Sequence, residues 1–432
     1  MKRAKQSKIW LLWLIVLEHF CVSRVWAQDR ASYVIDSGDT AWILVSSAFV
    51  LCMTLPGLAL FYGGLVRSKN VLGTIMHAAI ILCVISIVWV LWGYTLAFGS
   101  DVGGIIGGLD HLGLIGVGPE AFPGTGIPHL AFMVFQLMFA VLTVALVTGS
   151  FAERMKFKAL LLFAVLWSTF VYSPLTHWVW GGGWMAQMGF LDFAGGSVVH
   201  ISSGFGALVC AILVGKRKGL GVEAMPPHNL PMTVLGTGLL WFGWFGLNAG
   251  SALGANDVAA SAFVATHIAA CAGGFSWMVA EWINQGKPTV LGVASGIIAG
   301  LTAITPGAGF LGPLSALFVG LFVGVVCYVA VIWKMRLGYD DSLDVVGIHG
   351  VGGFIGILAT GLFASIGAQG LFFGNTSQFL VQAGLAIVTV VFALVGTFVV
   401  LKIVDMIIGL RLSVEDETMG LDLSQHNERA YS

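Results

Sequence analysis

The chain has 432 residues, of which 58% are hydrophobic and only 9% charged, and its formal net charge is −1 at neutral pH. Soluble domains usually carry about 25% charged residues, so this composition excludes a soluble enzyme, a disordered protein and a nucleic-acid-binding protein. It predicts a chain that lies mostly in lipid, where each charged group needs its own explanation.

The first 27 residues have the pattern of a secretory signal peptide. A basic start precedes an apolar run over 9–17, and Val25 and Ala27 suit the −3 and −1 positions of a cleavage site. We expect residues 1–27 to be removed, which places the mature N-terminus outside and the protein in a bacterial inner membrane or its equivalent. An uncleaved first span is the alternative, but Glu18 and His19 cut the apolar run short.

Eleven stretches that follow are long and apolar enough to cross a membrane as helices, for which roughly 20 residues are needed. The first five cover 40–66, 71–100, 129–152, 159–176 and 194–215. The other six cover 231–252, 258–282, 289–305, 311–333, 345–366 and 379–404. Two long uncharged runs are divided at turn-forming residues, at 305–309 and 374–377. The sequence therefore predicts an all-α polytopic membrane protein.

Positive charge alternates between the loops that join these spans. Lys and Arg residues follow spans 1, 3, 5, 7, 9 and 11, whereas the loops after spans 2, 4, 6, 8 and 10 contain none. One miscounted helix would scramble this alternation. By the positive-inside rule, the odd-numbered loops and the C-terminus are predicted to be cytoplasmic and the mature N-terminus outside.

The spans divide into five plus five plus one. Repeat halves of about 40–215 and 231–366 are followed by an extra helix at 379–404, within a membrane domain at 28–410, and by a cytoplasmic tail at 411–432. A tandem repeat of five spans must be inverted in the membrane, because five is odd. This arrangement is typical of transporters, whose site lies near the midplane where the repeats meet.

Two histidines occupy matching places in the halves. His200 lies in span 5, eight residues after Asp192, and His349 lies in span 10, five residues after Asp344. These separations are about 12 and about 7 Å along the helix axes, and the two spans run in opposite directions, so we expect both rings to meet near the midplane. Both acids are interpreted as helix caps, and Asp192 also as an organiser of a cation site. Two separate histidines bonded to backbone carbonyls are the alternative.

Aromatic residues gather at the outer ends of several spans. Interfacial belts account for Trp178 and Trp184, but an aromatic face near an acid also attracts a small cation. Asn248 and Ser251 add hydrogen-bonding groups at the outer end of span 6. The residues alone therefore predict a transporter of a small polar or cationic solute. The sequence contains no motif for an enzyme, a metal site or a cofactor, so none of these is expected.

The same residues form motifs that resemble the ammonium transporter (Amt/MEP/Rh) family, and the resemblance covers nearly all of 40–432. The motifs are Asp-Phe-Ala-Gly-Gly-Ser-Val-Val-His at 192–200, Pro-Gly-Leu-Ala-Leu-Phe-Tyr-Gly-Gly at 56–64, Pro-His-Asn-Leu-Pro at 227–231, Asn-Ala-Gly-Ser at 248–251 and Gly-Ile-His-Gly at 347–350. The tail is also similar to the family, at Gly420-Leu421-Asp422, His426 and Ala430-Tyr431.

The resemblance implies an outer recruitment site for ammonium or methylammonium. Trp180 and Ser251 would line this site together with Phe135, and Asp192 would shape it from behind. Family members form homotrimers with one pore in each subunit. PII-type nitrogen regulators can bind their cytoplasmic tails, but the sequence His426-Asn427-Glu428 differs from the usual tail pattern and leaves such docking open.

The resemblance also implies a gate and a relay below the recruitment site. Phe139 would be one gating ring, and His200 and His349 would be the twin histidines of a hydrophobic pore. The second gating ring of many members falls at Leu247 here. A leucine keeps the entrance dry but lacks the ring face that attracts a cation, so cation stabilisation at this position should be weaker.

The predicted function is transport in which ammonium is recruited, deprotonated and passed as ammonia, while the proton moves along the two imidazoles. Desolvating a bare cation costs many kcal/mol, which favours separating the proton first. Potassium cannot give up a proton, so this step also provides selectivity. An ammonium sensor with little flux and a Rhesus-like channel for neutral gas are the alternatives.

Overall fold

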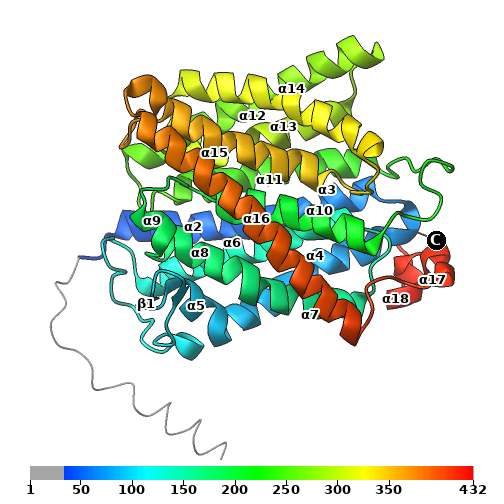
Figure 1. Cartoon of the computed structure of the whole chain (residues 1–432), viewed down its shortest axis with the longest axis horizontal. Coiled ribbons are helices and arrows are strands. Elements are labelled where there is room, and N and C mark those ends of the chain that lie inside the picture. The colour runs from blue at the N-terminus through cyan, green and yellow to red at the C-terminus, as the bar shows by residue number, and fades with distance from the viewer. Residues whose placement is uncertain (1–33, 432) are drawn as a thin grey trace, which may run out of the picture.

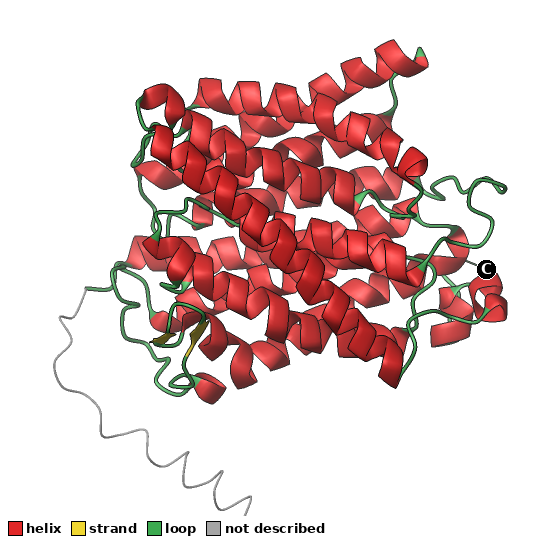
Figure 2. Cartoon of the chain, viewed as in Figure 1, coloured by secondary structure: helices red, strands yellow, loops and turns green. Residues whose placement is uncertain are grey.

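The computed structural model describes residues 34–431, and the predicted signal peptide lies outside these residues. Eleven helical stretches in the described part are long and apolar enough to cross a membrane. They begin and end within a few residues of the predicted spans, except that the fourth extends to Gln187, because it includes a further short helix that begins at Trp184 after a turn at 181–183. The prediction of an all-helical polytopic protein with eleven spans is therefore confirmed (Figures 1 and 2).

The first half contains five of these stretches, several of them built from consecutive helical segments, in which η marks a 3₁₀ or π segment. In chain order the elements are α2 (Ser37–Cys52), η1 (Met53–Leu58), α3 (Ala59–Leu65), η2 (Ser68–Asn70), α4 (Val71–Val88), η3 (Trp89–Gly93), α5 (Tyr94–Phe98), β1 (Asp101–Val102), β2 (Ile106–Gly107), η4 (Leu112–Leu114), α6 (His129–Val147), η5 (Thr148–Phe151), α7 (Phe157–Trp167), η6 (Ser168–Tyr172), α8 (Ser173–Trp180), α9 (Trp184–Gln187), η7 (Gly196–Ile201) and α10 (Ser202–Val214).

The second half and the tail complete the chain. Their elements are α11 (Leu230–Gly250), α12 (Asp257–Gln285), α13 (Val290–Ile304), η8 (Thr305–Gly307), α14 (Pro313–Leu337), η9 (Val346–Gly350), α15 (Val351–Phe363), η10 (Leu371–Phe373), α16 (Thr376–Ile407), α17 (Val414–Met419) and α18 (Leu421–His426). The breaks predicted at 305–309 and 374–377 are both present, since η8 ends α13 and the side chain of Asn375 caps α16.

The two ends of the helical bundle differ, and they are named here after their landmarks. The hairpin side carries the short antiparallel pair β1–β2, α9 and the start of α2, whereas the tail side carries α17 and α18 (Figure 1). The long helices run between these two sides (Figure 1).

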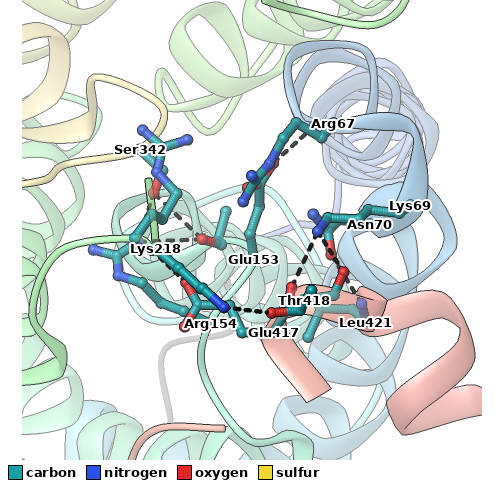
Figure 3. A network of polar contacts seen from close by, with 12 residues as sticks. Arg67, Lys69, Asn70, Glu153, Arg154, Lys218, Ser342, Glu417, Thr418 and Leu421 are labelled. Atoms are coloured by element: carbon teal, nitrogen blue, oxygen red, sulfur yellow. Dashed lines mark hydrogen bonds and ion pairs between the residues drawn. The ribbon is translucent and has the colours of Figure 1, made fainter. Parts of the chain in front are cut away.

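Loops from distant parts of the chain meet the tail helices on the tail side (Figure 3). Arg67, after α3, forms an ion pair with Glu153, after α6, at 2.6 Å. Lys218, after α10, donates its backbone N–H to the carboxylate of Glu417 at 2.7 Å. The ammonium group of Lys69 donates to the Thr418 carbonyl at 2.7 Å. The basic loops after spans 1, 3 and 5 therefore lie together with the tail, as the alternation of charge predicts.

Arg154 links the two halves at the same side. Its guanidinium is fully buried and donates to the carbonyls of Gly215 and Asp340 and to the hydroxyl of Ser342. Burial lowers the pKa of this guanidinium to about 10, an effect that the neighbouring Asp340 carboxylate opposes. A buried cation is tolerated here because these hydrogen bonds replace the water it has lost.

Candidate functional site

The centre of the molecule is the crossing of the fifth and tenth spans. His200 lies in η7 and His349 in η9, and both of these segments are π-helical. Single π-turns within longer helices often mark functional sites, because the extra residue changes the direction of the side chains. The two spans run in opposite directions between the hairpin and tail sides, so the two histidines approach each other from opposite ends, as expected.

Glycines allow the two helices to approach closely at the histidines. A methyl group placed on Gly204 would lie 2.1 Å from the backbone nitrogen of Gly350. One placed on Gly353 would lie 2.7 Å from the Cβ atom of His200. Small residues at a helix crossing permit this backbone contact, and they hold the imidazoles within hydrogen-bonding distance.

The two imidazoles form a buried pair. Their Nδ1 atoms lie 3.2 Å apart, and their rings are nearly parallel at 22°. His200 is fully buried, and His349 is 4% exposed. A hydrogen bond between two ring nitrogens needs one N–H and one lone pair, so the neutral pair shares one proton. The alternative of two separate histidines bonded to backbone carbonyls is therefore wrong.

Neighbouring side chains fix the orientation of the pair. The Thr302 hydroxyl lies 3.3 Å from Nδ1 of His349. The indole of Trp244 stacks on His200 with the ring centroids 5.4 Å apart, and its Nε1–H donates to Thr305 at 2.9 Å. Nε2 of His200 has no hydrogen-bond partner among residues 34–431. The pair therefore keeps a nitrogen available for a small polar solute.

A narrow cavity continues from the pair toward the tail side. It has a volume of about 10 Å³, enough for about one water-sized molecule. Three of the residues that line it carry a polar group, namely His349, Trp244 and Tyr62, and the others are apolar: Met53, Leu58, Phe61, Leu142, Leu146, Leu240 and Ile298. A neutral solute can pass such a surface at far lower cost than a bare ion.

Aromatic residues named in the sequence analysis meet on the hairpin side of the pair. Phe139 contacts Trp180 edge to face at 5.6 Å and Phe135 at 5.0 Å. Phe135 also packs against the position of Gly250, the residue before Ser251. Trp180 and Ser251 are partly exposed, whereas both phenylalanines are buried. These four residues therefore lie together, with Phe139 on the buried side of Trp180.

Asp192 caps the helix that carries His200. Its two carboxylate oxygens accept backbone N–H groups from Gly195, Gly196, Ser197 and Val198 at 2.6–3.2 Å. Its own carbonyl accepts Nε1–H of Trp180 at 2.8 Å. Both carboxylate oxygens are therefore bonded to the backbone, while the carbonyl of the same residue holds the indole of Trp180.

The last span supports the loop before this cap. The side-chain amide of Gln382 accepts the backbone N–H of Leu191 at 2.8 Å and donates to the carbonyl of Leu191 at 2.7 Å. The hydroxyls of Ser197 and Thr389 lie 2.8 Å apart. Both Gln382 and Thr389 belong to α16, so the helix outside the repeat holds the Asp192 loop in place.

Leu247 lies on α11 between Trp244 and Ser251. It is fully buried, and its carbonyl accepts the hydroxyl of Ser251 at 2.8 Å. Along this helix, an aliphatic side chain therefore lies between Ser251, near the aromatic cluster of Trp180, Phe135 and Phe139, and Trp244, which contacts the histidine pair. It can exclude water, but it offers no ring face to a cation.

The interpretation of Asp344 as the cap of span 10 is wrong. Asp344 forms an ion pair with Lys334 and has a left-handed backbone, with φ of 63°. The capping role belongs to Asp341, whose Oδ2 accepts the backbone N–H of Val346 at 2.7 Å. The left-handed turn at Asp344 directs the chain so that the earlier acid faces the start of the helix.

Sequence reasoning assigned no role to three residues at the centre. Trp244 and Thr302 contact the histidine pair, and Tyr62 lines the cavity below it. Trp244 lies one helical turn before the motif at 248–251, but a tryptophan in a span is usually attributed to packing or to an interfacial belt. Asp341 had a usable pattern, because it precedes His349 by the same eight residues that separate Asp192 from His200.

Comparisons with known proteins give a consistent result. The family model described as "Ammonium Transporter Family" matches residues 41–431. An ammonium transporter of Bacillus subtilis is 54% identical over 402 residues, which cover 91% of this chain and 98% of that protein. Ammonium transporter Amt1 of Archaeoglobus fulgidus is 48% identical, with 91% and 99% covered.

Solved structures show the same fold. The crystal structure of Mep2 from Saccharomyces cerevisiae has a TM-score of 0.83 and 37% identity, and covers 88% of this chain and 89% of its own. A structure named "Sensor Amt Protein" has a TM-score of 0.83 and 28% identity, with 90% and 98% covered.

Proposed function

The chain belongs to the ammonium transporter family, and from this premise we propose that it carries ammonium and methylammonium across a bacterial inner membrane. It acts as a transporter and not as an enzyme. The observation that supports the mechanism most directly is the buried His200–His349 pair, with its Nδ1 atoms 3.2 Å apart beside a narrow cavity.

The cation is recruited on the hairpin side, which faces the outside. Trp180 and Phe135 offer ring faces, and Ser251 offers a hydroxyl oxygen to an ammonium hydrogen. Asp192 holds Trp180 in place through the hydrogen bond to its own carbonyl. Phe139 and Leu247 act as the gate, and their apolar surfaces exclude the water that would accompany the ion.

Ammonium then separates into ammonia and a proton near this gate. A bare charge in the apolar region would lose its hydration without compensation, whereas ammonia is neutral and about as small as water. Ammonia passes beside the histidine pair into the cavity. The proton binds an imidazole nitrogen and moves across the Nδ1 contact to the other ring, so that transport carries net charge inward.

Two single variants test the relay. We expect His200→Ala and His349→Ala each to lose at least about 90% of the ammonium-driven current in proteoliposomes, since each removes one partner of the proton path. Potassium should be tested in parallel, because a path without the relay has no chemical reason to select ammonium. Wild-type current and wild-type potassium exclusion in both variants would refute the mechanism.

The orientation and assembly of the protein form part of the proposal. The tail side faces the cytoplasm, residues 1–27 act as a cleaved signal peptide, and three copies associate so that each subunit has its own pore. The tail helices offer a docking place for a PII-type regulator. Cleavage is tested by N-terminal sequencing of the membrane form, and assembly by the mass of the detergent-solubilised particle.

A sensor with little flux is the second candidate. Leu247 favours it, because it removes a ring from the gate, and a structure named for a sensor shares the fold at a TM-score of 0.83. Uptake of labelled methylammonium by a transport-deficient host separates the two functions. Robust saturable uptake supports the transporter, whereas binding without uptake supports the sensor.

A further inference from the structure

The two acids that cap the histidine helices are used differently. Asp192 and Asp341 each precede their histidine by eight residues. Asp192 accepts four backbone N–H groups, two on each oxygen. Asp341 uses Oδ2 for Val346, but its Oδ1 has no hydrogen-bond partner in the described chain, although the residue is fully buried. Burying an oxygen without a hydrogen-bond donor costs folding free energy, so such an oxygen usually has a water or a proton as its partner.

The neighbouring cation does not neutralise this oxygen. The ammonium group of Lys334 forms its ion pair with Asp344 and donates to the backbone carbonyl of Asp341 at 2.8 Å. Burial raises the pKa of the Asp341 carboxyl to about 6, Lys334 opposes the rise, and the Asp344 charge adds to it. The pKa of Asp341 therefore lies closer to neutral pH than that of an ordinary aspartate.

Asp341 does not line the cavity that begins at His349, but it interacts electrostatically with Tyr62, which does. Tyr62 lines this cavity, and its hydroxyl donates to the Leu146 carbonyl at 3.0 Å. A methyl group on Gly149 would lie 2.7 Å from both the Tyr62 ring and the Val345 side chain. Tyr62 thus joins the floor of the cavity to the start of the helix that Asp341 caps.

The titratable and charged groups around Asp341 come from several elements. Tyr62 is in α3, Arg154 follows η5, Cys210 is in α10, Lys334 is in α14, and Tyr339 and Asp344 are in the same loop as Asp341. All six interact electrostatically with the Asp341 carboxylate. The two cations among them are already bonded to Asp344 or to backbone carbonyls.

We propose that Asp341 is the proton acceptor on the tail side of the pore, a role that rests on the proposed function. The imidazolium formed at the histidine pair gives up its proton, which reaches Oδ1 of Asp341 through the cavity and converts the carboxylate to a carboxylic acid. The pair becomes neutral again and can receive the next proton. The acid then releases its proton to water at the tail side, which restores the carboxylate.

A relay is required, because Asp341 lies in the loop before the helix and is not part of the lining of the cavity that begins at His349. The cavity has room for about one water-sized molecule, and Tyr62, whose hydroxyl donates to the Leu146 carbonyl, is part of its lining. One water and this hydroxyl therefore supply the intermediate oxygen atoms. The hairpin side has no equivalent, because Asp192 has no free oxygen.

The test compares Asp341→Asn with the matched control Asp344→Asn in proteoliposomes that contain the full chain. The asparagine keeps an oxygen for the Val346 N–H but cannot carry a proton at this position. We expect Asp341→Asn to reduce the ammonium-driven current about tenfold with an unchanged apparent affinity, and Tyr62→Phe to reduce it less. Asp344→Asn should keep the wild-type current to within about twofold.

The pH on the tail side gives a second readout that needs no variant. The wild-type current should fall as this pH drops through about 6, because a protonated Asp341 cannot accept a proton. Asp341→Asn should lose this dependence. A flat wild-type profile, or a wild-type current and profile in Asp341→Asn, would overturn the role of Asp341. Absence of any ammonium current in the wild type would instead refute the proposed function.

Discussion

The hairpin side and the tail side of the pore have matching parts but different chemistry. On the hairpin side, the Asp192 carboxylate is saturated by four backbone N–H groups and the loop before it is held by α16. On the tail side, Oδ2 of Asp341 accepts the backbone N–H of Val346, whereas its Oδ1 has no hydrogen-bond partner among residues 34–431. The two ends therefore differ: the cap on the hairpin side is held by a full set of backbone bonds and positions Trp180, whereas the cap on the tail side keeps an oxygen to which we assign proton exchange.

The largest effect is expected from removing the carboxylate that caps the helix on the hairpin side. Asp192→Ala leaves four buried N–H groups without an acceptor, at about 1–3 kcal/mol each, and releases Trp180. We expect methylammonium uptake to fall roughly a hundredfold, as misplacement of positioning groups can do. Asp257→Ala, which alters an exposed acid on the same side, is the control. A folded and fully active Asp192→Ala protein would remove Asp192 from the mechanism.

The close contact between the fifth and tenth spans, midway between the two sides, can be disrupted by a separate substitution. Gly204→Ala places a methyl group 2.1 Å from the Gly350 backbone, and overpacking of this kind costs about 1–3 kcal/mol. We expect about a tenfold loss of uptake and a lower melting temperature, since the imidazoles are pushed apart. Gly384→Ala, in α16 with open space around it, should change neither. Equal behaviour of the two variants would mean that the close crossing is not required.

An aromatic ring at position 247 should strengthen cation binding on the hairpin side. Leu247→Phe should lower the apparent KM for methylammonium by about two- to fivefold, which corresponds to the 0.5–1 kcal/mol of a cation–π contact. The dependence of the current on tail-side pH should stay as in the wild type. A KM that does not fall, in a protein with unchanged stability, would show that the ring at this position adds nothing to cation binding.

The smallest effect concerns stability at the tail side. The folded protein raises the pKa of Asp341 from 3.8 to about 6, so the acid contributes stability below the unfolded pKa and loses this contribution as pH rises through about 6. Asp341→Asn should therefore melt a few degrees higher than the wild type at pH 8 but not at pH 4. Thermal unfolding in detergent measures this, and an equal difference at both pH values would contradict it.

Much of this fold could be predicted because lipid imposes strong constraints on sequence. Eleven apolar stretches and the alternation of basic loops leave little freedom in the number of spans. The pairing of His200 with His349 could also be predicted, because ionisable residues at depth are rare and the two occupy matching places. Membership in the family followed from motifs at the same residues.

Features that depend on local backbone conformation or on contacts between helices could not be predicted from the sequence. The sequence favours the nearer acid, Asp344, as the cap, but the left-handed backbone of Asp344 directs its side chain toward Lys334, and Asp341 caps the helix instead. The π-turns that orient both histidines have no hydrophobic period of their own that a sequence would reveal. The stack of Trp244 on His200 depends on a contact between separate helices, which residue spacing along one helix does not report.

The bonds between Gln382 and Leu191 set an order of events during synthesis. The loop at Leu191 leaves the ribosome 191 residues before Gln382, which supplies both of its hydrogen bonds. Until the eleventh span has inserted, the backbone groups that hold Asp192 and Trp180 in place lack their partners. A chain that stops after ten spans would therefore contain both histidines and every residue of the proposed recruitment site, yet its entrance would be unfinished. The last helix thus completes the entrance of the proposed pore by supplying these two hydrogen bonds.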